Sequence, residues 1–300
     1  MLRQTNAGKM ATHANRRLTA ALHDRSRHWL SRHLRLLASL LVLALGTLLG
    51  AQSKALAADD EDVWPALREA VFGAREVVES ATSVILEAPY RAEDAALVPI
   101  TIRIPAAVSA SAQKVTLLID KNPAAVAAVF TFGPAAGAGE RVISTRVRVD
   151  MYSNIRAVVE MADGKLLMAT KFVKAAGGCS APALKDTDAV LAEAGKMQVK
   201  IIDTAAGDRV REAQVKIRHP QYSGLQLNQA TGFYIPAKFL RTIEISRGSD
   251  VIFRVDGGIS LSEDPNIRFT YAPGGDESIE VVAEDIEGKR FSGRSAPKGS

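Results

Sequence analysis

The segment Val98-Pro99-Ile100-Thr101-Ile102-Arg103-Ile104 places an apolar side chain at every second position from its first residue to its last. Successive side chains of a β-strand point to opposite faces, so this alternation predicts a strand with one face in a core. Five further segments with the same period follow at 115–119, 126–132, 143–149, 155–161 and 168–172. They are separated by turn sequences at Lys121-Asn122-Pro123, Gly133-Pro134 and Asp163-Gly164. Short strands at this spacing predict an antiparallel β-sandwich.

A second series of alternating segments begins after residue 195. It covers 197–201, 213–217, 243–245, 251–255, 267–271 and 279–283, and a last edge strand is predicted within Lys289–Ser292. Between the two series, Ser180–Gly195 breaks the alternation, and we interpret it as a linker whose Ala189–Ala194 part favours two helical turns. Each series is long enough to enclose a core of its own.

One helix is predicted ahead of the first series, within Asp59–Val78. Apolar residues recur there at three- and four-residue spacing, and Gly73 is expected to end the helix. The sequence thus predicts an all-β protein with two sandwich domains in tandem, at 58–179 and 196–300, joined by the linker 180–195.

Residues 1–57 carry the pattern of a secretory signal peptide. A basic region precedes the uncharged run Leu36–Ala51, and Ala55-Leu56-Ala57 supplies small residues at a cleavage site. The alternative is a membrane anchor, for which the apolar run is short. We expect cleavage after Ala57, a periplasmic mature protein and no membrane attachment afterwards.

Removal of the leader changes the charge of the protein. The leader holds nine of the 38 Lys and Arg residues and one of the 33 Asp and Glu residues, so the mature chain has 38 − 9 = 29 basic and 33 − 1 = 32 acidic residues. A net charge of −3 argues against nucleic acid as a partner. The mature chain keeps one Cys and one His, too few for a Cys/His zinc site, and it has no Gly-rich phosphate loop. We therefore predict no metal and no cofactor.

The only cysteine, Cys179, follows two glycines and precedes a serine. Gly177 and Gly178 permit many backbone conformations, and none of the neighbouring side chains is β-branched or aromatic. We interpret Gly177, Gly178 and Ser180 as a flexible arm that presents a solvent-accessible thiol. The alternative is that Cys179 is a small buried apolar residue.

The longest irregular segment of the second series runs from His219 to Pro236. Long loops in compact domains are often functional. Because the sequence identifies no partner for His219, we interpret this histidine as a turn residue, with a chemical role as the alternative.

Several of these segments resemble proteins of sulfur oxidation. Residues 89–99, Lys121-Asn122-Pro123, 144–148 and Gly177-Gly178-Cys179 are similar to SoxY, the sulfur-carrying subunit of the periplasmic thiosulfate-oxidising system. His219-Pro220, Ser223-Gly224, Gly232, Ile235-Pro236 and Asp264-Pro265-Asn266 are similar to its partner SoxZ. Together they resemble the fused SoxYZ-like carriers associated with quinoprotein alcohol dehydrogenases.

The resemblance implies two immunoglobulin-like β-sandwiches and a carrier whose cysteine holds sulfur intermediates as a covalent adduct. It implies that periplasmic redox or hydrolase enzymes process the adduct on Cys179, and that the carrier is not itself an enzyme. In SoxY the arm closes the chain, whereas here Ser180-Ala181-Pro182 leads on into the second half. The loop is tethered at both ends, which limits its reach. The resemblance therefore does not identify the group that the thiol carries.

Three functions are consistent with the residues. The first is the thiol-based carrier. The second is a non-catalytic binding or scaffold module of a periplasmic dehydrogenase complex, in which Cys179 is incidental. The third is a thiol enzyme, which we rank last because the sequence shows no base, second cysteine or metal site beside the thiol.

Overall fold

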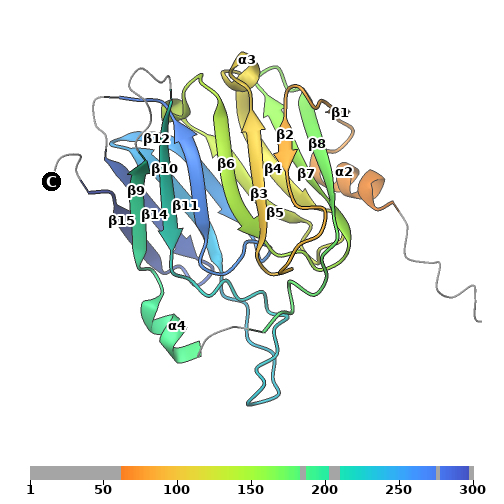
Figure 1. Cartoon of the computed structure of the whole chain (residues 1–300), viewed down its shortest axis with the longest axis vertical. Coiled ribbons are helices and arrows are strands. Elements are labelled where there is room, and N and C mark those ends of the chain that lie inside the picture. The colour runs from red at the N-terminus through yellow and green to blue at the C-terminus, as the bar shows by residue number, and fades with distance from the viewer. Residues whose placement is uncertain (1–61, 183–186, 203–209, 275–277, 297–300) are drawn as a thin grey trace, which may run out of the picture. The chain divides into compact units, whose positions relative to one another are not determined.

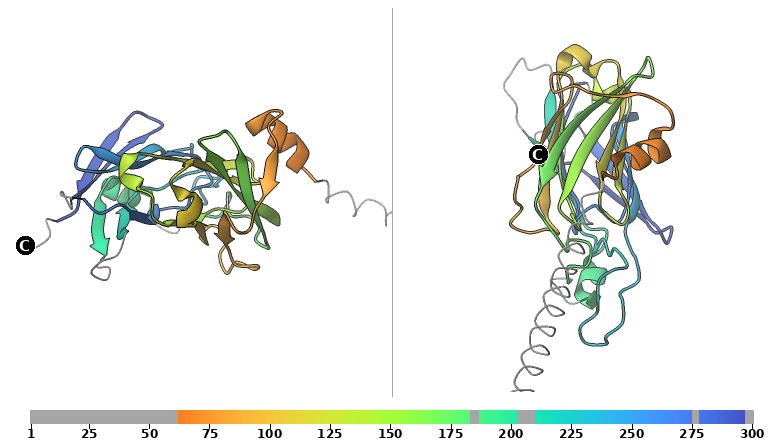
Figure 2. Two further views of the ribbon diagram at one scale, coloured as in Figure 1. Left: turned by 90° about the horizontal axis from the view of Figure 1, so that it is seen from above. Right: turned by 90° about the vertical axis from the view of Figure 1, so that its right-hand side faces the viewer.

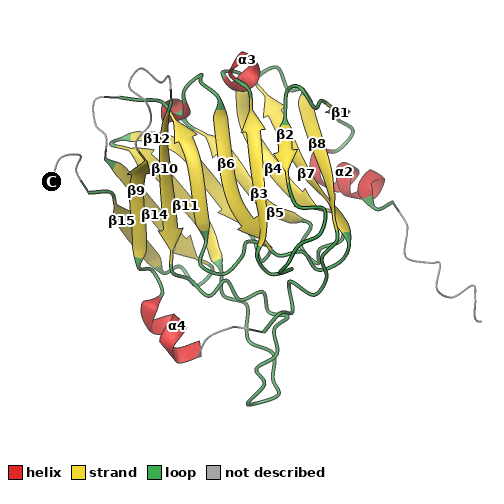
Figure 3. Cartoon of the chain, viewed as in Figure 1, coloured by secondary structure: helices red, strands yellow, loops and turns green. Residues whose placement is uncertain are grey.

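Strands account for most of the ordered secondary structure of this protein (Figure 3). The computed structural model describes residues 62–182, 187–202, 210–274 and 278–296. Val63–Ser300 forms one compact unit. The predicted leader, 1–57, lies outside the described residues. Among the helices of the described part, none is long and apolar enough to cross a membrane. The prediction of an all-β protein is confirmed.

The strands form two sheets (Figure 1). The larger has nine strands in the order β1 (Val77–Glu79), β8 (Leu166–Val173), β7 (Ser153–Met161), β4 (Ala112–Ile119), β5 (Val126–Phe132), β12 (Asp250–Gly257), β11 (Leu240–Arg247), β14 (Ile279–Asp285) and β15 (Arg290–Arg294). The smaller has six, in the order β2 (Ile85–Glu87), β3 (Val98–Ile104), β6 (Arg141–Val147), β13 (Asn266–Tyr271), β10 (Arg211–Ile217) and β9 (Met197–Ile202). All neighbouring strands are antiparallel except β1 and β8.

The helical elements are short and lie outside the sheets. They are α2 (Trp64–Phe72), α3 (Ala106–Ser109), the 3-10 turn η2 (Pro134–Ala136) and α4 (Thr187–Glu193). The predictions of a helix ended by Gly73 and of a short helix near 189–194 are confirmed by α2 and α4. Strand β15 confirms the predicted last edge strand. Strands β1 and β2 were not predicted, because three residues are too few to show a period.

The two sheets face each other and enclose the core, as the edge-on views of Figure 2 show. In β3 the four alternating apolar side chains from Val98 to Ile104 are each at most 2% exposed. This burial is the outcome that the period of two predicts, since one face of the strand points inward. The other long predicted strands contribute buried residues to the same core, except β9, whose Met197, Val199 and Ile201 are partly buried against it.

The two halves of the chain are joined edge to edge, which differs from the expectation of separate sandwiches with separate cores. Strand β5 of the first half pairs with β12 of the second over Ala128–Phe132, and β6 pairs with β13. One apolar cluster spans both halves, and Phe253 contacts Phe130 and Phe269 at ring-centroid distances of 6.0 and 5.0 Å. The physical reason is that each half has edge strands with unpaired N–H and C=O groups. These groups form hydrogen bonds with the edge strands of the other half.

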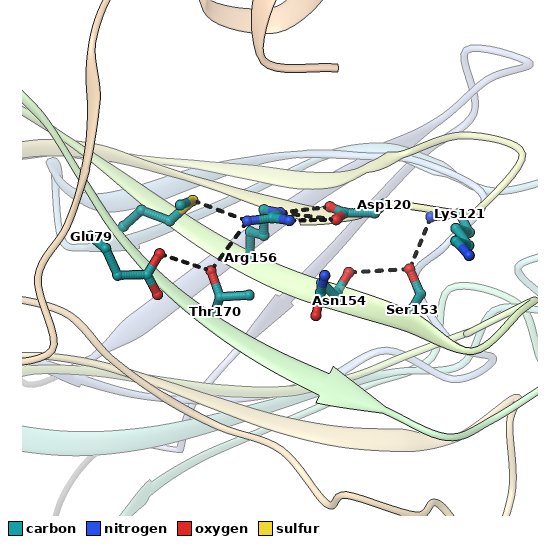
Figure 4. A network of polar contacts seen from close by, with 8 residues as sticks. Glu79, Asp120, Lys121, Ser153, Asn154, Arg156 and Thr170 are labelled. Carbon is teal, nitrogen blue, oxygen red and sulfur yellow. Dashed lines mark hydrogen bonds and ion pairs between the residues drawn. The ribbon is translucent and has the colours of Figure 1, made fainter. Parts of the chain in front are cut away.

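A buried ion pair holds the first half of the large sheet together. The Arg156 guanidinium on β7 donates to both carboxylate oxygens of Asp120, at 2.8–3.0 Å (Figure 4). The two side chains are 8% and 4% exposed. The Trp64 ring of α2 covers the guanidinium, 4.2 Å from its central carbon. The pair therefore anchors α2 as well as the end of β4.

Removal of this carboxylate should be costly. Asp120→Ala leaves the Arg156 charge buried without its partner, so we expect the free energy of unfolding to fall by about 3 kcal/mol. Urea unfolding followed by circular dichroism measures it. Asp256→Ala is the control, because Asp256 forms an ion pair with Arg254 in which both side chains are about half exposed, and it should cost far less. Equal losses for the two variants would contradict the structural role of the buried pair.

Candidate functional site

The segment that carries Cys179 lies against the strand end that follows β6. The Gly177 N–H donates to the Asp150 carbonyl at 2.8 Å, and the Gly178 N–H donates to the Val149 carbonyl at 3.0 Å. Gly177 has a φ of +79°, a conformation that favours glycine. The arm therefore has a defined path, which corrects the expectation that its glycines serve free movement in this state.

Gly178 is required by close packing. A Cβ atom at this position would lie 2.1 Å from the Ala95 carbonyl oxygen and 2.7 Å from that of Val149. Two backbone segments thus approach the arm where only a glycine fits. Gly177 and Ser180, on either side of the Gly178-Cys179 pair, are exposed.

Cys179 is completely buried, at 0% exposure, so the predicted solvent-accessible thiol is wrong for this structure. Its N–H donates to Asp150 Oδ1 at 3.2 Å, and its carbonyl accepts a hydrogen bond from Ser223 Oγ. Gln226 Nε2 donates to the carbonyl of Ala181, two residues farther along, at 3.1 Å. Ser223 and Gln226 belong to the second half of the chain. The residues next to Cys179 in sequence therefore do not show that the arm is covered.

A buried arginine lies beside the arm. Arg148 is 2% exposed, and its Nη1 and Nη2 donate to the Gly178 and Gln221 carbonyls at 3.1 and 3.3 Å. Its Nε has no hydrogen-bond partner, and no carboxylate within the described residues forms an ion pair with it. A buried charge without a counter-ion is costly, so Arg148 favours negative charge in its surroundings.

The electrostatics of the closed site oppose ionisation of the thiol. Burial, with a smaller contribution from Asp150, raises the pKa of Cys179 to about 11, although the Arg148 charge acts in the opposite direction. The reference pKa of a free cysteine is about 8.5, and the thiolate is the reactive form. In this position Cys179 is therefore a protonated, unreactive thiol at neutral pH. It must leave the closed position to react.

His219 has a structural position near the base of the same loop. Its Nδ1 accepts a hydrogen bond from the Gln221 N–H at 3.2 Å, and its own N–H donates to Asp264 Oδ1 at 3.0 Å. Burial lowers the pKa of His219 to about 4, so the ring is neutral at physiological pH. Its ring packs edge-on to Phe291 at 6.1 Å. Within the described residues no hydrogen bond joins it to Cys179, which agrees with the interpretation as a turn residue.

The residues that sequence reasoning missed are those that close the site: Arg148, Asp150, Gln221, Ser223 and Gln226. Arg148 lies out of phase with the buried positions of its strand, so the alternation places it on a solvent face. It is buried because the 219–238 segment covers that face. In the described part of the chain no cluster of three or more His, Cys, Asp and Glu residues is arranged to hold a metal.

The comparisons with known proteins agree with the sequence resemblance. Residues 68–179 match the family of the sulfur oxidation protein SoxY, and residues 199–296 match that of the sulphur oxidation protein SoxZ. The class of protein is thus a sulfur-oxidation carrier protein, and proteins of this class work with partner sulfur-oxidation enzymes. With both domains in one polypeptide, the chain belongs to the fused SoxYZ-like proteins.

Solved structures were also compared. The sulfur carrier protein SoxY from Chlorobium limicola f thiosulfatophilum is 28% identical, with a TM-score of 0.32, over 38% of this chain and 91% of that one. A beta-glycosidase from Bacteroides vulgatus is 9% identical, with a TM-score of 0.22, over 71% of this chain and 24% of that one. The comparison with curated proteins gave no match. The assignment rests on the two family matches.

Enlargement of Gly178 should open the site. A Cβ atom 2.1 Å from the Ala95 carbonyl oxygen displaces the arm, so Gly178→Ala should react with dithiobis(nitrobenzoate) at least about tenfold faster than the native chain. Ser180→Ala removes an exposed hydroxyl and its 3.3 Å hydrogen bond to the Gly177 carbonyl, creates no clash, and should stay within about twofold. If Gly178→Ala labels no faster than the control, the closed arrangement does not protect the thiol.

The raised pKa also predicts how protection depends on pH. A pKa of about 11 in the closed position stabilises closure while the thiol is protonated; this stabilisation is complete below the open-state value of about 8.5 and is lost as pH rises toward 11. The ratio of labelling rates for denatured and native chains should therefore be constant from pH 6 to about pH 8 and fall above it. A ratio that rises with pH would show that the closed site favours the thiolate.

Proposed function

We propose that this chain is an exported, periplasmic carrier that holds a sulfur-containing intermediate covalently on Cys179 and presents it to partner enzymes. The observation that carries the proposal is the position of the only thiol. It is the last residue of the SoxY match, and residues of the SoxZ half cover it. The export signal within 1–57 supports a periplasmic location.

The closed structure supports a carrier with two states. In the closed state the thiol is buried and protonated, and both halves hold its backbone. In the open state solvent reaches the sulfur, its pKa returns toward about 8.5, and a few per cent of it is thiolate at neutral pH. The thiol is therefore protected from reaction while no partner enzyme is bound.

Loading occurs by nucleophilic exchange. The Cys179 thiolate attacks one sulfur of an S–S bond in the donor, a new S–S bond forms to Cys179, and the displaced sulfur leaves with the electron pair of the broken bond. No external oxidant is consumed, because the donor already contains the oxidised sulfur. The adduct then passes to enzymes that cleave or oxidise it.

The partners are periplasmic redox or hydrolase enzymes of a sulfur-oxidation system or of a quinoprotein alcohol dehydrogenase system. The chain continues after Ser180-Ala181-Pro182 into α4 and the second half, so the thiol moves on a loop held at both ends. A partner site must therefore admit a loop and cannot require a free chain end. The carrier needs no metal or cofactor for this role.

A scaffold function is the alternative, and one observation favours it. Cys179 is fully buried with a raised pKa, which is the expected state of an incidental core cysteine. In that case the arm would not open under native conditions, and the two joined halves would serve only to bind other proteins.

Adduct formation separates the two functions. The native mature chain is incubated with tetrathionate at neutral pH, the thiolate displaces thiosulfate, and mass spectrometry should find the adduct on the peptide that contains Cys179. Cys179→Ser should lose the adduct and keep its circular dichroism spectrum. Modification of only the denatured chain would refute the carrier and favour the scaffold.

A further inference from the structure

A hairpin projects from the sheets beside Cys179. It spans Gln221–Lys238, and Figure 1 shows it as the teal loop that extends farthest below the strands. Backbone bridges pair Tyr222 with Lys238 at its base and Leu227 with Tyr234 nearer its tip. Because the hairpin projects from the sheets, many of its side chains are exposed to solvent.

The hairpin is uncharged apart from Lys238, its last residue. Residues 219–237 contain no Asp, Glu, Lys or Arg, although 24% of the chain is charged. At that frequency these 19 residues would carry 0.24 × 19, or about 4.6, charges. The centres of protein–protein interfaces are depleted in charge in the same way.

Apolar side chains are exposed at its tip. Phe233 and Tyr234 are 75% and 68% exposed, the two highest values for large apolar or aromatic residues in the described part of the chain. Leu225 and Leu227 are exposed at 38% and 45%. Adjacent exposed aromatic residues mark an interaction site, and aromatic residues supply much of the affinity of protein interfaces.

The tip is ordered by its own hydrogen bonds. The Asn228 N–H donates to the Phe233 carbonyl and the Gly232 N–H donates to the Asn228 carbonyl, both at 2.8 Å. Asn228 Oδ1 also accepts from the Ala230 and Thr231 N–H groups at 3.0 and 3.2 Å. The aromatic side chains thus start from a fixed backbone, which lowers the entropy lost on binding.

We propose that this hairpin is the surface by which an enzyme partner binds the carrier, with Phe233 and Tyr234 in an uncharged apolar recess of that enzyme. The inference rests on the carrier function proposed above. Ser223 and Gln226 at the base of the hairpin hold the carbonyls of Cys179 and Ala181, so the surface that binds the enzyme and the cover of the thiol belong to the same hairpin.

The charges argue against two other occupants. Membrane-binding surfaces combine apolar residues with several Lys and Arg residues, whereas the hairpin has no Arg and a single Lys, Lys238 at its base. A second copy of this chain would have to supply an apolar recess. Of two cavities on the described surface, one of about 550 Å³ has six charged side chains in its lining, among them Arg146, Glu193 and Lys196. The other, of about 380 Å³, has Glu79, Glu87 and Lys171 beside its apolar residues, so neither is an uncharged recess.

The test compares two double variants of the mature chain. Phe233→Ser with Tyr234→Ser removes the exposed aromatic rings. Val282→Ser with Ile286→Ser removes two apolar side chains of similar partial exposure, 45% and 40%, on β14 and the turn after it. The probe is a purified sulfur-oxidation enzyme of the same organism that turns over the group bound to Cys179.

We expect the hairpin variant to lose about 30- to 100-fold in kcat/KM, mainly through KM, and to lose as much in Kd by surface plasmon resonance. The control should stay within about twofold of the unmodified chain. An unchanged kcat/KM for the hairpin variant would overturn the proposal. So would a dimer in sedimentation that only the hairpin variant abolishes, or binding to phosphatidylcholine–phosphatidylglycerol vesicles that only this variant loses.

Adduct formation with tetrathionate is measured on each variant without any partner. If the adduct forms and kcat/KM is unchanged, the docking surface is wrong and the carrier function stands. If no adduct forms on the unmodified native chain, the carrier function itself fails.

Discussion

The pairing of β5 with β12 is the constraint on which the rest of the structure depends. Their backbone hydrogen bonds, with those between β6 and β13, turn two half-sheets into continuous sheets and bring Phe130, Phe253 and Phe269 together in the core. Without this junction each half would expose an edge strand and part of its apolar face. The same junction sets the hairpin of the second half over the arm of the first.

The arrangement at Cys179 follows from that placement. Backbone bonds from the strand end at Val149 and Asp150 fix the arm on one side, and Ser223 and Gln226 fix it on the other. Burial keeps the thiol protonated, while Arg148 lies close by as a buried cation without an ion-pair partner in the described residues. A thiol that is unreactive when covered and reactive when uncovered is consistent with the proposed carrier function, in which the thiol is protected from unwanted reactions.

The fused chain differs in one respect from two separate subunits. Cover and thiol belong to one polypeptide, so closure of the site requires no encounter between subunits and does not depend on protein concentration. Under the proposed function, a thiol in the middle of the chain moves on a loop and not on a free chain end.

The sequence by itself determined the long strands, their division into two series and the position of the lone thiol. Alternation at Val98–Ile104 and its counterparts is a local property, because the period of side-chain direction depends only on neighbouring residues. The sequence also showed the lone Cys179 after Gly177-Gly178 and the similarity to SoxY and SoxZ. The two family matches confirm this family.

Only the tertiary structure decided that Cys179 is buried, that Gly178 is needed for close approach, and that Arg148 faces the arm. Alternation states which face of a strand is apolar but not which strand lies beside it, so the junction of the halves was not predictable. The cover over Cys179 comes from Ser223 and Gln226, more than forty residues away in sequence. Burial depends on such distant neighbours, whereas composition describes only the adjacent ones, and for that reason the prediction of a solvent-accessible thiol was wrong.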